Sequence, residues 1–234
     1  MAVLSTALPR PAAPQRPLRR RTVRILLALL LGYAVLWAAG AGGILAVSYW
    51  MREETPAPAG TRTVQGVHNF QPVDTSGHLW RGAAPSPAGY RTLAAMGFTT
   101  VVDLRAEDLS AHQLAGPADA GLDVVRLPIR DGQTPRPEQV RRLLDIVADS
   151  SGPVFVHCGA GVGRTGTMAA AYLVQTGEES SAAAVRRNLA VGPPSIEQIY
   201  YGLNLSRHTA AQPPLPVVAV SRLVDAPRRI ASWF

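Results

Sequence analysis

The sequence has a single cysteine and no lysine, and these two scarcities narrow its chemistry. One cysteine cannot form a disulfide within the chain, so a disulfide-stapled scaffold is excluded. The five histidines show no spacing typical of metal ligands, and we expect neither a metal nor another cofactor. Together with abundant alanine, the use of arginine alone as the long basic residue indicates a GC-rich, bacterial gene.

Positive charge is concentrated at the start of the chain. The formal net charge is +7, and six arginines lie within residues 1–24, a segment without an acidic residue. The remainder is nearly neutral, so the high pI does not indicate nucleic-acid binding, and no nucleic-acid partner is expected. We interpret residues 1–24 as a basic N-terminal tail.

Residues 25–50 form one long apolar run without a charged side chain. About 20 such residues are enough for a helix to span a bilayer, whereas the apolar core of a signal peptide usually has about 7–15 residues. Tyr49 and Trp50 at the end of the run are typical of the membrane–water interface. We therefore predict an uncleaved transmembrane helix and a membrane partner through residues 25–50.

The lone cysteine, Cys158, lies in a glycine-rich segment between a predicted strand at 152–156 and a predicted helix at 167–174. Backbone N–H groups converge on anions at such strand–loop–helix junctions. A phosphate monoester bound there would meet the Cys158 sulfur and the guanidinium group of Arg164. The same amides and the helix dipole stabilise a thiolate, the nucleophilic form of cysteine. This Cys–Arg loop comprises His157, Cys158, Gly159, Ala160, Gly161, Val162, Gly163 and Arg164.

The loop resembles the signature of the Cys-based protein tyrosine phosphatase superfamily in its dual-specificity branch, His-Cys-x-x-Gly-x-x-Arg-Thr/Ser-Gly. The resemblance implies that Cys158 is the nucleophile, forming a phosphocysteine, and that Arg164 binds the phosphate and stabilises the transition state. Thr165 would donate a hydrogen bond to the sulfur and ease its departure. His157 would fix the loop and favour the thiolate without touching substrate. The alternative is a cysteine that only packs in the core.

A proton donor for the leaving group is expected on a loop upstream of the cysteine, as the resemblance implies. Asp131 is the candidate, because Gly132 and Pro135 mark a loop directly after a strand pattern. A solvated turn aspartate is the alternative interpretation of this residue. Asp103 is the competitor, and we assign it to capping or to an ion pair with Arg105.

A glutamine late in the domain positions water in the classical tyrosine phosphatases. Gln198 is the residue in this sequence that could serve in that way. We expect Gln198 on an exposed helix face and do not assign it a catalytic role.

The remaining pattern predicts an α/β fold, with a central, mostly parallel sheet flanked by helices as in dual-specificity phosphatases, preceded by one transmembrane helix. Ser86 and Pro87 are a typical N-cap and first residue of a helix that stops at Gly97. Expected strands cover residues 98–104 and 124–127, and expected helices cover 134–149, 182–190 and 195–207. The predicted segments are a linker at 51–63, the phosphatase domain at 64–208, and a Pro-rich tail at 209–234, which we expect to be disordered rather than membrane-bound.

Three functions fit these residues. The main hypothesis is a membrane-anchored phosphatase acting on phosphotyrosine, with phosphoserine and phosphothreonine as further candidates; its partner would be a phosphorylated protein or a small phosphomonoester. The second is a phosphoinositide or inositol-phosphate phosphatase, although such enzymes often carry loop lysines where this sequence has Gly159 and Val162. The third is a non-catalytic pseudophosphatase that binds phosphate, which the presence of cysteine, arginine and acid disfavours.

Charge also predicts the orientation of the chain in the membrane. Arginines crowd the N-terminal flank of residues 25–50, whereas Arg52 on the other flank is followed by Glu53 and Glu54. The positive-inside rule then places the N-terminus in the cytoplasm and the catalytic domain on the extracytoplasmic side. A lone cysteine is compatible with that location, which would expose a reactive thiolate to oxidation.

Overall fold

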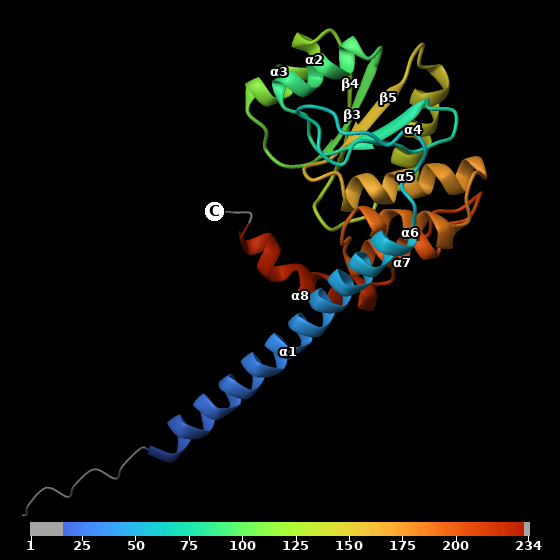
Figure 1. Cartoon of the computed structure of the whole chain (residues 1–234). Coiled ribbons are helices and arrows are strands. Elements are labelled where there is room, and N and C mark those ends of the chain that lie inside the picture. The colour runs from blue at the N-terminus through green and yellow to red at the C-terminus, as the bar shows by residue number, and fades with distance from the viewer. Residues whose placement is uncertain (1–15, 232–234) are drawn as a thin grey trace, which may run out of the picture.

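Five strands form the central sheet of the computed structural model, which describes residues 16–231 (Figure 1). They are β1 (Gln71–Pro72), β2 (Leu79–Gly82), β3 (Thr100–Arg105), β4 (Asp123–Ile129) and β5 (Val154–His157), in the order β1-β2-β5-β3-β4. The edge strand β1 is antiparallel to β2, and the other neighbours are parallel. The predicted mostly parallel sheet is confirmed, and the carboxyl ends of β2, β5, β3 and β4 meet at one edge.

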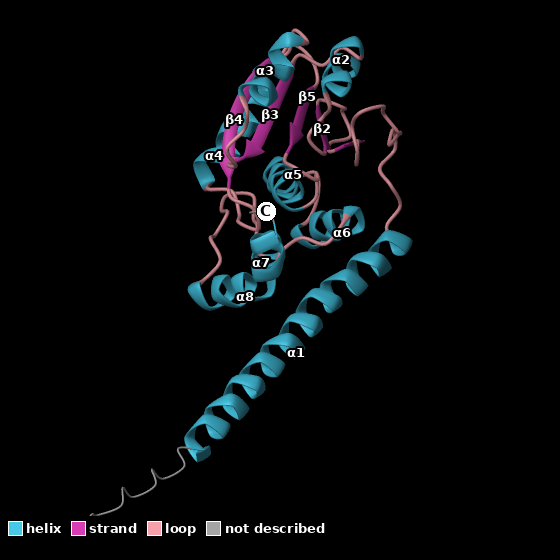
Figure 2. Ribbon diagram, turned by 90° about the vertical axis from the view of Figure 1, so that its left-hand side faces the viewer, coloured by secondary structure: helices cyan, strands magenta, loops and turns pink. Residues whose placement is uncertain are grey.

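Helices cover both faces of this sheet (Figure 2). One face carries α4 (Pro137–Asp149) and α5 (Gly163–Thr176), and the other carries α2 (Pro87–Ala95) and α3 (Ala111–Asp119). Alternation along the strands explains the two cores, because Val102 and Val156 belong to the first and their neighbours Val101 and Phe155 to the second. A further layer of α6 (Ser181–Val191) and α7 (Ile196–Leu203) packs on α5.

The predicted elements are present with small differences in their bounds. The helix after Ser86 begins with that residue as its N-cap, as expected. The last predicted helix is shorter than expected and ends at Leu203. The helix α3 was not predicted, because Pro117 inside it breaks the helical pattern of the sequence. Its start is nevertheless marked by a capping box between Ser110 and Gln113.

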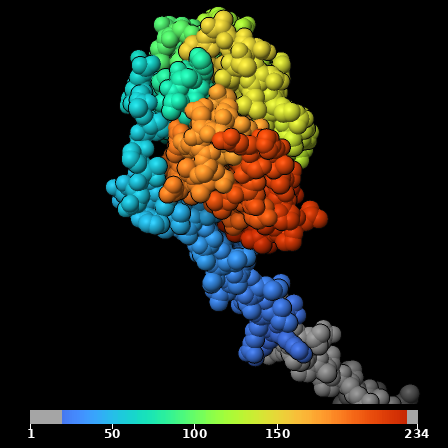
Figure 3. Space-filling view, turned by 90° about the vertical axis from the view of Figure 1, so that its right-hand side faces the viewer, coloured from blue at the N-terminus to red at the C-terminus, as the bar shows by residue number. Residues whose placement is uncertain are grey.

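The N-terminal helix α1 runs from Arg16 to Glu54 without a break. Among the described residues, this one helix is long and apolar enough to cross a membrane, over residues 20–54. Figure 3 shows it projecting from the body of the protein. Residues 16–24 of the predicted basic tail and residues 51–54 of the predicted linker belong to this helix, whereas residues 1–15 of the tail lie outside the described part.

The carboxyl-terminal part of α1 is docked on the domain by polar contacts. The Ser48 hydroxyl, buried in the interface, donates to the carbonyl of Leu189 at 2.6 Å. Arg52 donates to the carbonyls of Ala190 and Val191 at 3.3 Å each. These three carbonyls lie in the last turn of α6, where a helix lacks internal donors. The end of α1 therefore caps α6.

Residues 209–231 of the tail are not disordered, contrary to the prediction, and residues 232–234 lie outside the described part. Residues 215–231 form the helix α8 (Leu215–Ala231), which packs against α7 and α1. The prolines that suggested disorder lie before this helix and at Pro216, in its first turn. Proline is tolerated there because the first-turn amides have no acceptor within the helix.

Candidate active site

The Cys–Arg loop joins the end of β5 to the first turn of α5, and each of its carbonyl groups from Cys158 to Gly163 accepts a hydrogen bond. The carbonyl of Cys158 accepts from His157 Nδ1 (3.0 Å), that of Gly159 from the Ala84 amide (2.8 Å), and that of Ala160 from Asn69 Nδ2 (2.9 Å). The carbonyl of Gly161 accepts from Arg81 Nη2 (2.7 Å), that of Val162 from the Gly166 amide (2.9 Å), and that of Gly163 from Thr167 Oγ1 (2.8 Å). The loop is thus held with its acceptors pointing away from its centre.

The amides of the loop take the opposite direction. In a trans peptide, the N–H of each residue is antiparallel to the carbonyl of the residue before it. Among the residues that the structure describes, the N–H groups of residues 159–162 donate to no protein group. Together with the N-terminus of α5 they form an anion cradle, and Cys158 lies buried at its base.

Gly161 allows this loop to approach the end of β2. Its backbone is left-handed, with φ at +74°, and a Cβ atom there would lie 2.3 Å from the carbonyl carbon of Gly82 and 2.4 Å from the amide nitrogen of Ala83. Both neighbours are backbone atoms that cannot give way cheaply. A glycine is therefore required at this position for both reasons.

Arg81 is a buried cation beneath the loop that the sequence analysis did not single out. Its Nη2 atom donates to the carbonyls of Gly161 and Val162 and to Asn188 Oδ1, the last at 3.2 Å. Burial lowers the pKa of Arg81 to about 10, and the nearby Cys158 opposes that shift. The guanidinium is thus charged at neutral pH and interacts electrostatically with Cys158. The signal in the sequence that could have revealed Arg81 was an arginine within a predicted strand of the central sheet.

One edge of the Arg164 guanidinium is bonded to protein groups, and the other edge is open. Its Nη1 and Nη2 atoms donate to the two carboxylate oxygens of Glu107 at 2.7 Å each, and Nη1 also donates to the carbonyl of Ile129 at 3.1 Å. The Nε atom is buried and has no hydrogen-bond partner in the described part of the chain. The edge formed by Nε and Nη2 therefore retains donors for two oxygens of a ligand.

Glu107 is the second residue that sequence reasoning missed. It follows β3, at the same sheet edge as the Cys–Arg loop, and half of its side chain is exposed. Burial would raise the pKa of Glu107, but the hydrogen bonds and charge of Arg164 lower it below its usual value. An ionised carboxylate thus fixes the direction of the Arg164 side chain. A charged residue just after a buried strand was the available signal.

Asp131 lies directly after β4, on the open side of Arg164. Its Oδ1 atom is 3.6 Å from Arg164 Nε, and 46% of its side chain is exposed. The loop behind it is held by α7, since Ser195 Oγ donates to the carbonyl of Gly132 at 2.7 Å. The structure therefore brings the predicted acid to the predicted phosphate ligand.

Gln198 is buried, and the prediction that it lies on an exposed helix face was wrong. Its Nε2 atom donates to the carbonyl of Gln133 at 2.9 Å, and its Oε1 atom accepts from the Ser195 amide at 3.0 Å. A Cβ atom on Gly163 would lie 2.6 Å from that Oε1 atom. The side chain thus touches both the loop after Asp131 and the Cys–Arg loop, which makes it a positioning residue.

His157 is fully buried and holds the base of the loop. Burial lowers the pKa of His157 to about 4, although the neighbouring Asp103 opposes the shift. A carbonyl can only accept, so Nδ1 must carry the proton that bonds Cys158, and Nε2 is left to face the Tyr90 hydroxyl at 3.5 Å. The expectation that this residue fixes the loop agrees with these contacts.

Two further residues can be compared with their expected roles. Asp103 forms an ion pair with Arg105 at 2.9 Å, as predicted, and is thereby separated from the acid function. The Thr165 hydroxyl is buried and has no hydrogen-bond partner in the described part of the chain. A bond from Thr165 to the Cys158 sulfur is thus not formed here, and its role in the second step stays a prediction.

The sheet and the loop define a Cys-based phosphatase of the dual-specificity type. Residues 59–201 match the family model for the "DSP-PTPase phosphatase fused to NAD+ Kinase", and the chain belongs to that family. The resemblance based on the Cys–Arg loop is confirmed.

Individual relatives match shorter segments. The "Probable NAD kinase 2, chloroplastic" of Oryza sativa subsp. japonica is 40% identical over 98 residues, covering 38% of this chain and 10% of that protein. The human "Dual specificity protein phosphatase CDC14C" is 36% identical over 101 residues, covering 41% of this chain and 22% of that protein. The chain therefore spans a small part of these relatives.

A solved structure supports the fold. The core catalytic domain of the PP-IP phosphatase SIW14 from S. cerevisiae superposes with a TM-score of 0.51 at 18% identity, covering 62% of this chain and 89% of that domain. At this identity the likeness concerns the fold alone.

The buried His157 predicts a loss of stability in acid. The pKa of His157 is about 4 in the folded protein, against 6.5 for an exposed histidine, so between these limits the unfolded chain binds more protons. Lowering the pH from 7 to 4 should cost about 3 kcal/mol of unfolding free energy through this residue. Denaturant titrations in detergent over this range would measure it. His157→Asn should flatten the slope, whereas the exposed control His208→Asn should not; equal slopes in both would contradict the assignment.

Removing the charge of Glu107 should loosen Arg164. In Glu107→Gln the amide retains one acceptor, so one charge-assisted bond is lost. We expect kcat/KM for an aryl phosphate to fall on the order of tenfold, and inhibition by inorganic phosphate to weaken in parallel. The exposed Glu138→Gln is the matched control. Steady-state kinetics with an unchanged phosphate inhibition constant would refute the positioning role.

Proposed function

We propose that this phosphatase hydrolyses phosphate monoesters, with phosphotyrosine as the main substrate, through a phosphocysteine intermediate, while α1 anchors it in a membrane. The observation that carries the chemistry is the inverted loop: amides on the inside, Cys158 at the base, and an open guanidinium edge on Arg164. This arrangement matches a tetrahedral dianion whose phosphorus faces the sulfur.

In the first step the Cys158 thiolate attacks phosphorus. The sulfur–phosphorus bond forms as the bond to the ester oxygen breaks, and protonated Asp131 delivers its proton to that oxygen. The free edge of Arg164 and the loop amides bind the three non-bridging oxygens, whose charge they stabilise in the transition state. Arg81 stabilises the thiolate from below.

In the second step a water molecule attacks the phosphocysteine. The Asp131 carboxylate, now deprotonated, takes a proton from this water, and the phosphorus–sulfur bond breaks to release inorganic phosphate and the thiolate. The 3.6 Å distance between Asp131 Oδ1 and Arg164 Nε supports this role, because the acid then lies next to the phosphate ligand in both steps. Thr165 would donate to the departing sulfur.

The proposed substrate class rests on the lack of further cations in the loop. Gly159 and Val162 offer no charge to a second phosphate, which disfavours a highly charged inositol head group. A panel of phosphotyrosine peptide, phosphoserine peptide and inositol lipid, offered to the full chain in detergent, tests this choice. A higher kcat/KM for the lipid would overturn the substrate class and leave the chemistry standing.

Cys158→Ser should abolish turnover. The hydroxyl is a far weaker nucleophile than a thiolate, and loss of the nucleophile should lower kcat by roughly 10⁴-fold or more. Phosphate affinity should remain, because amides and Arg164 are unchanged. Stopping a wild-type reaction with acid should trap phosphate on Cys158, detected by mass spectrometry of the peptide. Appreciable turnover by the variant would exclude the nucleophile.

Asp131→Asn should slow the reaction according to the leaving group. Without the acid we expect a loss of about 10²–10⁴-fold for alkyl phosphates and a smaller loss for nitrophenyl phosphate, whose leaving group needs no proton. The basic limb of the pH–rate profile should flatten. Asp145→Asn, on the exposed face of α4, is the control. Identical losses for both leaving groups would place the acid elsewhere.

We also propose that the catalytic domain lies on the extracytoplasmic side. The support is the charge difference between the flanks of residues 25–50. Protease added to intact cells should remove the domain, whereas protease added to sealed inverted vesicles should leave it intact. Digestion in inverted vesicles alone would reverse the orientation without affecting the chemistry.

A further inference from the structure

The C-terminal helix α8 has apolar residues on both of its sides, and protein covers one of them. Its inner side packs on α7 and α1: Ser221 is buried and accepts from the amide of Glu197 at 3.1 Å, and Val224 is buried as well. Figure 2 shows α8 below α7, at the end of the body from which α1 departs. Packing of the inner side thus explains where the helix lies, but it does not explain why the outer side is apolar.

The outer side of α8 is apolar and exposed. Leu215, Val220 and Leu223 have 82%, 45% and 50% of their surface exposed. Their spacing places them along one stripe of the helix, bordered by the exposed Arg222. A stripe of large apolar residues beside a cation is typical of a helix lying at a membrane surface.

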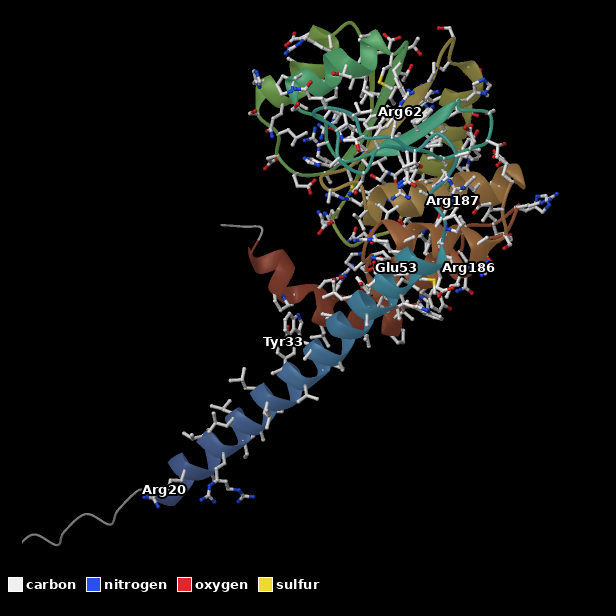
Figure 4. The ribbon with its side chains drawn as sticks, viewed as in Figure 1. Arg20, Tyr33, Glu53, Arg62, Arg186 and Arg187 are labelled. Carbon is white, nitrogen blue, oxygen red and sulfur yellow. The ribbon has the colours of Figure 1, made fainter. Side chains whose placement is uncertain are left out.

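The contacts between α8 and α1 fix the level at which this stripe lies. The Tyr33 hydroxyl donates to the carbonyl of Leu223 at 3.0 Å, and Figure 4 shows Tyr33 reaching from α1 toward α8. A Cβ atom on Gly40 would lie 2.9 Å from Val224 Cγ2. The second contact is thus deep within the apolar run of residues 25–50, well before its end.

The length of α1 below these contacts is too short to span a bilayer. Residues 20–32 lie on the N-terminal side of Tyr33, and a helix of this length measures about 20 Å at 1.5 Å per residue. The hydrocarbon layer is about 30 Å thick. A bilayer that surrounds the exposed apolar residues of α1 therefore extends to the level of α8 and meets the outer side of that helix.

We infer that the outer side of α8 is a second membrane contact, which faces the acyl chains of the bilayer that α1 spans. The inference rests on the proposed anchor. Leu215, Val220 and Leu223 contact the acyl chains. Lipid is the occupant because the outer side is continuous with the exposed apolar surface of α1.

Photolabelling from the lipid phase tests this contact. The full chain is reconstituted in vesicles of phosphatidylcholine and phosphatidylglycerol that contain a phospholipid with a diazirine in its acyl chain, and labelled peptides are mapped by mass spectrometry. We expect label on residues 25–50 and on residues 215–223. Leu114 on α3 and Val124 on β4 are 40% and 38% exposed, lie away from α1, and should stay unlabelled.

A variant makes the test specific for the outer side. Val220→Ser combined with Leu223→Ser should lower the labelling of residues 215–223 several-fold, without changing that of residues 25–50 or the turnover of a soluble aryl phosphate. Leu114→Ser is the matched control and should change none of these readouts. Label on residues 25–50 with none on α8 overturns the inference and leaves the anchor intact. Cross-links from α8 to a second copy in place of lipid overturn it equally. Label on neither helix refutes the anchor itself.

Discussion

The outward direction of the carbonyl groups between Cys158 and Gly163 is the constraint on which the site depends. Each of these acceptors would lose its hydration in the fold, so each needs a donor, and the donors come from separate elements. The set is Asn69, Arg81, Ala84, His157, Gly166 and Thr167. The sheet and its helices thus hold the carbonyl groups of one short loop outward, which leaves the amides on its inner side available to a phosphate group.

The two arginines of the site are oriented toward different partners. Arg164 presents one edge to Glu107 and Ile129, and the other remains available on the side of Asp131. Arg81 is buried beneath the loop and interacts electrostatically with Cys158. The cations that would balance a thiolate and a bound dianion therefore do not compete, because each is fixed by its own set of acceptors.

Local pattern in the sequence pointed to Cys158, Arg164 and Asp131, whose catalytic roles stay predictions. Cys158, Arg164 and the glycines lie within one short segment, and Asp131 follows a strand and precedes Gly132, so local pattern located them. Arg81 and Glu107 were missed because strand pairing, not proximity in the chain, brings them to the loop. Gln198 was misplaced because an amphipathic pattern cannot show that the first turn of α7 abuts the loop after Asp131. The helix α8 was missed because prolines in a first turn look like disorder.

The unbroken helix α1 affects how often the catalytic domain would encounter its substrates. A domain on a flexible tether explores a volume set by the length of that tether. Here an unbroken helix is joined to the domain through Ser48 and Arg52, so no such volume exists. In the anchored state the Cys158 sulfur would stay at a nearly constant distance from the membrane as the protein diffuses laterally. Dephosphorylation would then depend on the number of phosphoesters per unit area at that height, and scarcely on their concentration in the surrounding solution.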